Sequence, residues 1–139
     1  MFRNIQNNVF SLAVSQDSSL ASYLSLAKTM GDLGNSLPEY FRRIKAAFLS
    51  NFTLLGLPEI FRVRAIFHNI WAETYLAPYN QYAQEILNPE SKLYEFQPEL
   101  VYFILDPIED QLSQLYDLAL SIRDRTDAKV VFLSPRISS

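Results

Sequence analysis

The chain has 139 residues, of which 49% are hydrophobic and 14% aromatic, a composition that suits one compact globular domain. Its formal net charge of −3 and its dispersed basic residues give no footprint for nucleic acid and no polybasic surface for a membrane. The chain has no cysteine, so disulfides and thiolate metal sites are excluded, and without a signal-peptide pattern or a long apolar run we expect a cytoplasmic protein.

The first 44 residues are expected to form an N-terminal arm and a helical cap, placed before a core of residues 45–139. Apolar residues recur at helical spacing from Ser18 to Thr29, with Ser18 or Ser19 as the N-cap and Gly31 or Gly34 just beyond the end. A cluster of turn residues occupies 31–38. A second, short helix is predicted over 37–44, because Pro38 is tolerated in a first turn.

From Lys45 onward the pattern alternates between strands and helices. Strands are predicted over 45–49, 71–77, 100–106 and 129–134. Helices are predicted over 57–69, 79–87 and 108–122. The run from Leu100 to Asp106 is almost uninterrupted in apolar residues, which is typical of a strand buried on both faces. Such alternation predicts an α/β fold with a doubly wound, three-layer parallel sheet and an N-terminal helical extension.

Ligands in doubly wound folds bind outside the carboxyl ends of the strands, so the residues that follow each strand are the candidate site. They are Ser50, Asn51, Phe52 and Thr53 after the first strand, Pro78, Tyr79, Asn80, Gln81 and Tyr82 after the second, Asp106 and Pro107 after the third, and Ser134, Pro135 and Arg136 after the fourth. The segment Tyr79–Gln81 is the best binding candidate, because it places an amide pair at a helix start. Asp106 has two interpretations of equal weight: it binds a ligand or anchors a loop, or it caps the next helix.

Two stretches carry a family resemblance. One is Phe48-Leu-Ser-Asn-Phe-Thr-Leu54, and the other runs from Glu73 to Leu100 and contains Tyr-Asn-Gln-Tyr and Ser-Lys-Leu-Tyr. Over about residues 40–135 the chain resembles the N-terminal domain of FkbH-like proteins. Members of that family join an SGNH-hydrolase-like α/β domain to a haloacid-dehalogenase-type (HAD-type) phosphatase domain, and the best known load a glyceryl unit onto an acyl carrier protein.

The resemblance implies an SGNH- or flavodoxin-like fold, a place in polyketide biosynthesis, and a HAD-type phosphatase domain or an acyl carrier protein as partner. The phosphatase motif Asp-x-Asp-x-Thr does not occur, because Asp124 to Asp127 reads Asp-Arg-Thr-Asp and Asp106 is followed by Pro-Ile-Glu. The chain is therefore expected to be the isolated N-terminal domain or a truncated relative.

Hydrolysis by this domain itself requires a nucleophile and a base. The resemblance aligns Phe52 with the nucleophilic serine of SGNH enzymes, and a benzyl group cannot attack a carbonyl. Ser50 or Thr53 are weak substitutes, since the only imidazole, His68, is expected at the opposite edge of the sheet. We therefore predict a non-catalytic module that assists glyceryl transfer by docking or substrate binding; the alternative is an esterase or acyl transferase that uses Ser50 or Thr53.

No cofactor and no metal site are predicted. Of the carboxylates that could form a pair, Glu109 and Asp110 fall in the first turn of a predicted helix, where acidic side chains favour the helix dipole. The other carboxylates that could suggest a metal site or a carboxylate pair are Glu73, Glu85 and Asp106. Half or more of the tyrosines that could line a pocket are expected in the core: Tyr75, Tyr79, Tyr82, Tyr94 and Tyr102.

Overall fold

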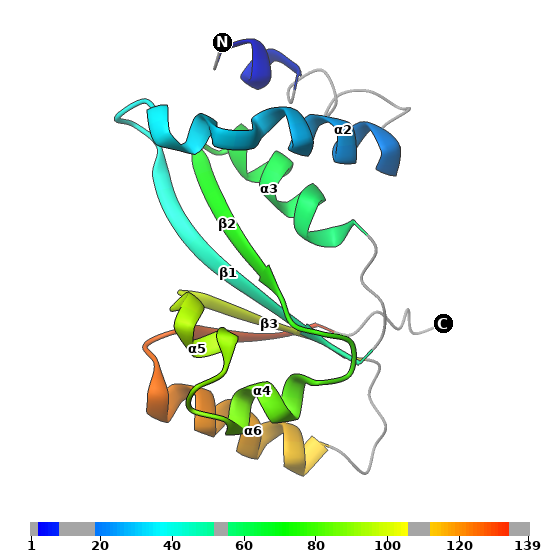
Figure 1. Cartoon of the computed structure of the whole chain (residues 1–139), viewed down its shortest axis with the longest axis vertical. Coiled ribbons are helices and arrows are strands. Elements are labelled where there is room, and N and C mark those ends of the chain that lie inside the picture. The colour runs from blue at the N-terminus through cyan, green and yellow to red at the C-terminus, as the bar shows by residue number, and fades with distance from the viewer. Residues whose placement is uncertain (1–2, 9–18, 52–55, 106–111, 134–139) are drawn as a thin grey trace. The chain divides into compact units, whose positions relative to one another are not determined.

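The computed structural model describes residues 3–8, 19–51, 56–105 and 112–133 (Figure 1). After a helical segment over 3–8, the elements in chain order are α2 (Leu20–Met30), the 3-10 helix η1 (Gly31–Ser36), β1 (Arg42–Ser50), α3 (Leu57–Phe67), β2 (Ile70–Leu76), α4 (Tyr82–Leu87), α5 (Lys92–Phe96), β3 (Leu100–Ile104), α6 (Leu112–Arg125) and β4 (Lys129–Leu133). The chain forms two compact units: Met1–Ile44 with Leu55–Glu73, and Lys45–Leu54 with Thr74–Ser139.

The strands form one parallel sheet in the order β2-β1-β3-β4. From β1 the chain winds first to β2 and then back past β1 to β3 and β4. With right-handed crossovers, this reversal defines a doubly wound sheet and corresponds to the flavodoxin-like strand order. The α/β fold class predicted from the sequence is therefore confirmed.

The register aligns the carboxyl ends of three strands. Ser50 at the end of β1 lies opposite Ile104 of β3, which lies opposite Leu133 of β4. The N–H of Leu105 continues this ladder by donating to the carbonyl of Leu133 at 3.2 Å. The carboxyl ends of these three strands consequently lie together at one end of the sheet.

One predicted element is wrong, and several bounds shift. The helix expected over 37–44 does not form: residues 39–40 are a turn, and β1 begins at Arg42. The Arg42 N–H donates to the carbonyl of Asn69 at 3.0 Å, so a partner distant in sequence outcompetes the local helical preference of this segment. The helix predicted from Tyr79 begins only at Tyr82, and residues 108–111 lie outside the described ranges.

The first unit is built around α2 and α3. The Ser19 hydroxyl accepts the N–H of Ser22 at 3.2 Å and caps α2, as the sequence predicts for a serine at this position. The buried side chains of this unit come from the segment 3–8, α2, α3 and β2: Ile5, Tyr23, Ala27, Met30, Val63, Ile66 and Trp71. They form a small core of their own, which removes the apolar faces of both helices from water.

Gly34 allows η1 to approach the indole of Trp71 closely. A Cβ on Gly34 would lie 2.6 Å from Trp71 Nε1, closer than van der Waals contact permits. Gly56, which precedes α3, has a φ of 79°, and a Cβ at this position would contact the flexible side chain of Leu20. Gly34 therefore requires glycine for packing against the rigid indole, and Gly56 requires it for its left-handed backbone.

The second unit contains the larger core. Ala47, Leu49, Val101 and Phe103 of the inner strands β1 and β3 are fully buried in it. Helices α4, α5 and α6 contribute the buried residues Tyr82, Ile86, Leu93, Leu115, Leu118 and Ile122. In the part of the chain that is described, no helix has the length and apolar character needed to cross a bilayer.

Candidate functional site

The carboxyl ends of β1 and β2 are joined by backbone hydrogen bonds in the second unit. The Ala77 N–H donates to the carbonyl of Phe48 at 3.0 Å, and the Asn80 N–H donates to the carbonyl of Ser50 at 3.3 Å. Asn80 has a φ of 53°, a left-handed conformation that asparagine adopts more readily than most residues. This turn brings two of the predicted loop segments, Ser50–Asn51 and Tyr79–Gln81, to the same edge of the sheet.

The residues predicted to follow the carboxyl ends of the strands, which together we call the rim, differ in their exposure. Tyr79, Asn80 and Gln81 are exposed, whereas Ser50 is only 5% exposed. Tyr82 is buried in the core, because it begins α4 with its ring on the inner face. Asn51 is half-buried. The other predicted site residues lie outside the described ranges: Phe52, Thr53, Asp106, Pro107, Ser134, Pro135 and Arg136.

The only histidine follows the end of α3. His68 is exposed, its N–H donates to the carbonyl of Ala65 at 2.9 Å, and its ring makes an edge contact with Phe67. It directly precedes Asn69 and the first residue of β2. This position belongs to the amino end of β2, whereas the candidate rim follows the carboxyl ends of the strands.

A hydrogen-bond network behind the rim was not predicted. The Tyr75 hydroxyl donates to Glu85 Oε1 at 2.5 Å, and the Leu93 N–H donates to Glu85 Oε2 at 3.2 Å. The Ser91 hydroxyl donates to the carbonyl of Glu85 at 2.6 Å. Glu85 thus links β2, α4 and α5. No sequence pattern predicts that Glu85 joins these elements, because turns of the chain separate it from both Tyr75 and Leu93.

Burial raises the pKa of the Tyr75 hydroxyl above its ordinary value, and the hydrogen bond to the Glu85 carboxylate raises it further. The carboxylate favours the protonated phenol, because a phenolate beside it would place two negative charges together. Tyr75 is therefore a hydrogen-bond donor at neutral pH and not a general base.

A second network fastens the end of α4. The Tyr94 hydroxyl donates to the carbonyl of Ile86, and Arg125 Nη1 donates to the carbonyls of Ile86 and Leu87 at 3.1 Å each. The Arg125 guanidinium also lies over the Tyr94 ring, 5.5 Å from its centroid. Burial raises the pKa of Tyr94, and the charge of Arg125 opposes this shift. The last carbonyls of α4 thereby obtain the partners that a helix end lacks.

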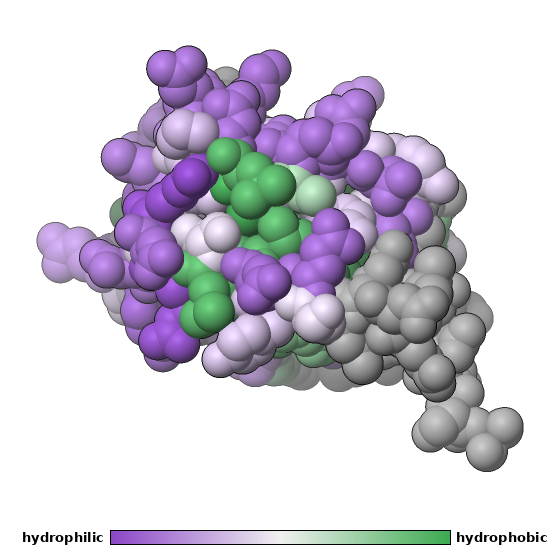
Figure 2. All heavy atoms as spheres, turned by 90° about the horizontal axis from the view of Figure 1, so that it is seen from below, coloured by the Kyte–Doolittle hydropathy of each residue, from purple (hydrophilic) through white to green (hydrophobic). Residues whose placement is uncertain are grey.

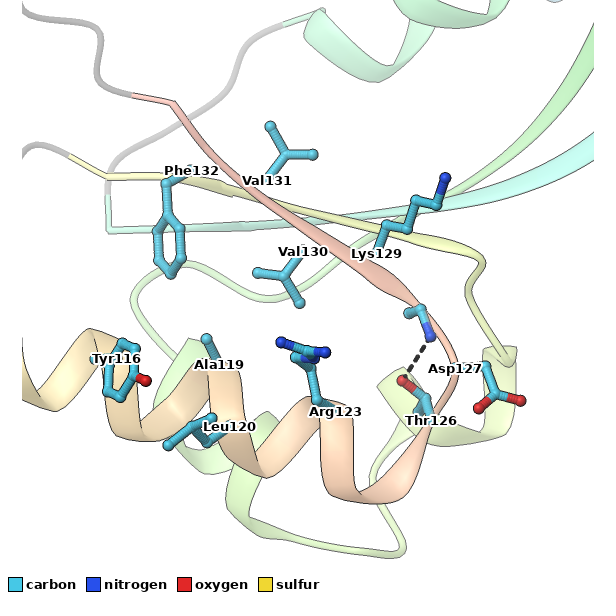
Figure 3. Close-up of a pocket in the computed structure, with 11 residues that line it drawn as sticks. Tyr116, Ala119, Leu120, Arg123, Thr126, Asp127, Lys129, Val130, Val131 and Phe132 are labelled. Atoms are coloured by element: carbon cyan, nitrogen blue, oxygen red, sulfur yellow. Dashed lines mark hydrogen bonds between the residues drawn. The ribbon is translucent and has the colours of Figure 1, made fainter.

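A groove of about 730 Å³ lies between α6 and β4 (Figure 3). The side chains of Val130 and Phe132 extend from β4 toward α6, while that of Val131 extends to the other face of the sheet. From α6, Arg123 extends toward Val130. The remaining lining residues are Tyr116, Ala119, Leu120, Thr126, Asp127, Ala128 and Lys129. Sequence reasoning missed this groove, because it depends on β4 lying at the edge of the sheet.

Among the described residues of the rim and the groove, none belongs to a group that could hold a metal ion. Within the described ranges, no three histidine, cysteine, aspartate or glutamate side chains lie close enough together to hold an ion. The chemistry that the described site offers is hydrogen bonding by exposed amides at the rim and apolar contact in the groove.

No protein-family model matches the sequence, and no curated protein matches it either. Among solved structures, the fold is similar to the crystal structure of the N-terminal part of the protein BF1531 from Bacteroides fragilis, which contains a phosphatase domain complexed with Mg. The TM-score is 0.61 at 20% sequence identity, over 84% of this chain and 34% of that chain. The chain thus spans about a third of that structure and shares its fold over most of its own length.

Proposed function

We propose that this chain is a non-catalytic α/β module that assists a HAD-type phosphatase in transferring a glyceryl unit to an acyl carrier protein, by docking or by helping to bind the substrate. The observation that carries this proposal is the composition of the rim. It contains a buried serine and a turn held by backbone hydrogen bonds, next to the place where the family resemblance would put the nucleophilic serine of an SGNH enzyme. The fold similarity to the N-terminal part of a protein that contains a phosphatase domain supports it. Glyceryl transfer is proposed as the reaction because the sequence resembles the N-terminal domains of FkbH-like proteins.

The non-catalytic role follows from what a serine nucleophile needs. The hydroxyl must reach both the substrate and a base within about 2.6–3.2 Å. Ser50 is 5% exposed and lies at the end of a central strand, where its carbonyl holds the Asn80 N–H. The single imidazole of the chain, His68, precedes the amino end of β2. The rim therefore favours holding a partner or ligand over attacking one.

Substrate binding, if the module contributes to it, involves the exposed turn after β2. Tyr79, Asn80 and Gln81 present a phenol and two amides, which donate to and accept from hydroxyl, carboxylate and phosphoryl oxygens. The hydrogen bond between Asn80 and Ser50 fixes the backbone of this turn. A fixed turn loses little conformational entropy when it binds a ligand.

The test combines the purified chain with a separately expressed HAD-type phosphatase domain of an FkbH-like protein and an acyl carrier protein. Isothermal titration calorimetry should detect a complex with the phosphatase domain or the carrier protein. Glyceryl transfer to the carrier should be faster with the chain than without it. No complex and no change in rate would refute the proposal. It would also be refuted by hydrolysis of p-nitrophenyl acetate that Ser50→Ala or Thr53→Ala abolishes.

A variant pair separates docking from substrate binding. Substitution of Tyr79 and Gln81 by alanine should slow transfer without weakening the complex if the turn binds substrate, and should weaken the complex if the turn is a docking contact. Glu90→Ala is the matched control, because Glu90 is exposed in the loop between α4 and α5 and its backbone N–H bonds locally to Asn88 Oδ1. It should change neither measurement.

A further inference from the structure

Among the described strands, β4 has a neighbour on one side only, which is β3. The Lys129 N–H donates to the carbonyl of Glu99 at 2.9 Å, and the carbonyl of Leu133 accepts from Leu105 at 3.2 Å. Because backbone groups alternate in direction along a strand, Lys129, Val131 and Leu133 face β3. The N–H and C=O groups of Val130 and Phe132 therefore point to the outer edge, where no strand of the described sheet follows β4.

The sequence of β4 is that of an interior strand. Lys129-Val-Val-Phe-Leu133 is β-branched and aromatic, as is the buried strand β3. Yet Phe132 is 49% exposed and Leu133 47% exposed. Edge strands are normally protected from pairing by short length, by a charged side chain such as lysine, by a proline or by a bulge. Strand β4 is five residues long and has a lysine at its first position, but Val130 to Leu133 contain no charge and no proline. Its composition thus fits a strand that has a neighbour on both sides.

The helical side of this edge is also apolar. Figure 2, which views the molecule from below, shows hydrophobic side chains gathered in the middle of the face that α4 and α6 form, within a ring of hydrophilic ones. The exposed large hydrophobic residues of these two helices are Leu87, Tyr116 and Leu120. Tyr116 and Leu120 also line the groove beside β4, so the apolar surface continues from α6 to the open edge.

The charge in the groove identifies the kind of occupant. The charged residues that line the groove are Arg123, Lys129 and Asp127, so the lining carries a net positive charge, and Arg123 extends toward Val130 (Figure 3). Arg123 forms no ion pair with another residue of the described ranges. A second copy paired edge to edge would bring another groove of the same net positive charge. The groove instead complements a segment that carries its own acidic side chain.

We propose that the outer edge of β4 and the groove along α6 bind an extended, acidic segment of a partner protein, which adds a fifth strand to the sheet. The segment exchanges backbone hydrogen bonds with Val130 and Phe132 and places alternate apolar side chains over Tyr116 and Leu120. Its carboxylate pairs with Arg123. This inference rests on the proposed docking function, for which it names the surface.

The first experiment measures amide hydrogen exchange in the full chain by NMR, with two synthetic peptides as probes. One alternates threonine with valine and carries a single glutamate, and the other has lysine in place of that glutamate. The glutamate peptide should slow exchange at the Val130 and Phe132 amides at least tenfold, and the lysine peptide should slow it much less. Arg123→Glu should reverse this preference. Equal effects of the two peptides, or no slowing at these amides, would overturn the proposal.

Self-association is tested in the same samples. Light scattering should give the mass of one chain at every concentration used for NMR. If the mass doubles and the Val130 and Phe132 amides exchange slowly without peptide, a second copy of the chain occupies the outer edge of β4. That result would refute binding of an acidic partner.

Two proline variants test the backbone contact. Val130→Pro removes an N–H that points outward, so the fold should persist while peptide binding is lost. Val131→Pro removes an N–H that points to β3 and should unfold the unit. Should Val130→Pro also unfold it, Arg123→Glu still tests the surface, because it changes an exposed helix residue.

The partner assay separates this inference from the proposed function. If Val130→Pro and Arg123→Glu bind the phosphatase domain or carrier protein as tightly as the unsubstituted chain does, the edge inference fails and the docking function stands. If the unsubstituted chain binds the glutamate peptide at β4 but neither protein, the docking function fails and the edge is a strand-binding site for another acidic partner.

Discussion

Tyr75 and Glu85 join the end of β2 to α4 by a hydrogen bond of 2.5 Å between the phenol and Oε1 of the carboxylate. The second oxygen of Glu85 accepts the N–H of Leu93 at the start of α5, at 3.2 Å. One carboxylate therefore fixes the two short helices that follow the candidate rim. Helices of five and six residues are too short to be stable alone, so such tertiary contacts hold them in place.

Replacing Tyr75 by phenylalanine should lower the free energy of unfolding by about 1–2 kcal/mol, because a hydrogen bond to a charged group is lost and one carboxylate oxygen loses its partner. Urea denaturation followed by circular dichroism measures this change. The control is Tyr79→Phe, since Tyr79 is exposed. Equal stability of the Tyr75 variant and the unsubstituted chain would show that water replaces the phenol without cost.

The same pair predicts the response of stability to alkaline pH. Burial and the Glu85 carboxylate raise the pKa of Tyr75 above 10.0, its value in the unfolded chain. Above about pH 10 the unfolded state has released this proton while the folded state retains it, so stability should fall as the pH rises. The decline should be shallower in Tyr75→Phe. Burial also raises the pKa values of Tyr94 and Tyr102, so part of the decline should remain. A steeper decline in the variant would contradict the assignment.

Gly34→Ala should destabilise the first unit by about 1–3 kcal/mol, because the added methyl group would lie 2.6 Å from Trp71 Nε1 and force the indole to move. Trp71 is the only tryptophan, so its fluorescence reports both the displacement and the unfolding transition. Asn35→Ala changes an exposed neighbour in η1 and should leave both unaffected. An unshifted emission maximum in Gly34→Ala would show that the contact relaxes elsewhere.

Arg125→Ala should cost about 1–2 kcal/mol, because two carbonyls at the end of α4 lose a charged donor. Amide exchange at Asn88, whose N–H bonds to the carbonyl of Gln84 in the last turn of α4, should become faster. Arg123→Ala removes the same charge from the same helix, with no described hydrogen bond to α4. Arg123→Ala should lower the stability by less than half as much as Arg125→Ala. Equal losses would mean that the change in net charge, and not the loss of the helix cap, causes the destabilisation.

The stacked rings of Phe103 and Phe132, with centroids 5.0 Å apart, should differ strongly in their contribution to stability. Phe103 is fully buried between strands and helices, so Phe103→Ala should cost about 3–5 kcal/mol. Phe132→Ala should cost less than about 1 kcal/mol, because half of this ring already lies in water. Both values come from urea midpoints. A large cost at Phe132 would mean that the edge of β4 is part of the core and not available to a partner.

Tyr79 and Tyr82 show how far the sequence predicts the site. Both follow β2 within a few residues, and sequence reasoning placed both at the rim. The structure exposes Tyr79 in the turn and buries Tyr82 in the core. Which residue faces inward depends on the residue at which α4 starts, and the turn before α4 is bonded to β1 through the Asn80 N–H and the Ser50 carbonyl. A contact between positions 30 residues apart leaves no local signal.

The sequence by itself determined the class of fold, because apolar runs such as Leu100–Ile104 and the apolar face of α6 specify strand or helix through their own periodicity. Only the tertiary structure decided that Arg42–Ile44 belongs to a strand, that Glu85 bridges three elements, and that β4 lies at the edge of the sheet. The reason is that β3 and β4 have equivalent compositions, and strand order arises from pairing between distant segments. The apolar pattern of a strand indicates which of its faces can be buried, whereas its position in the sheet depends on which other segments of the chain pair with it.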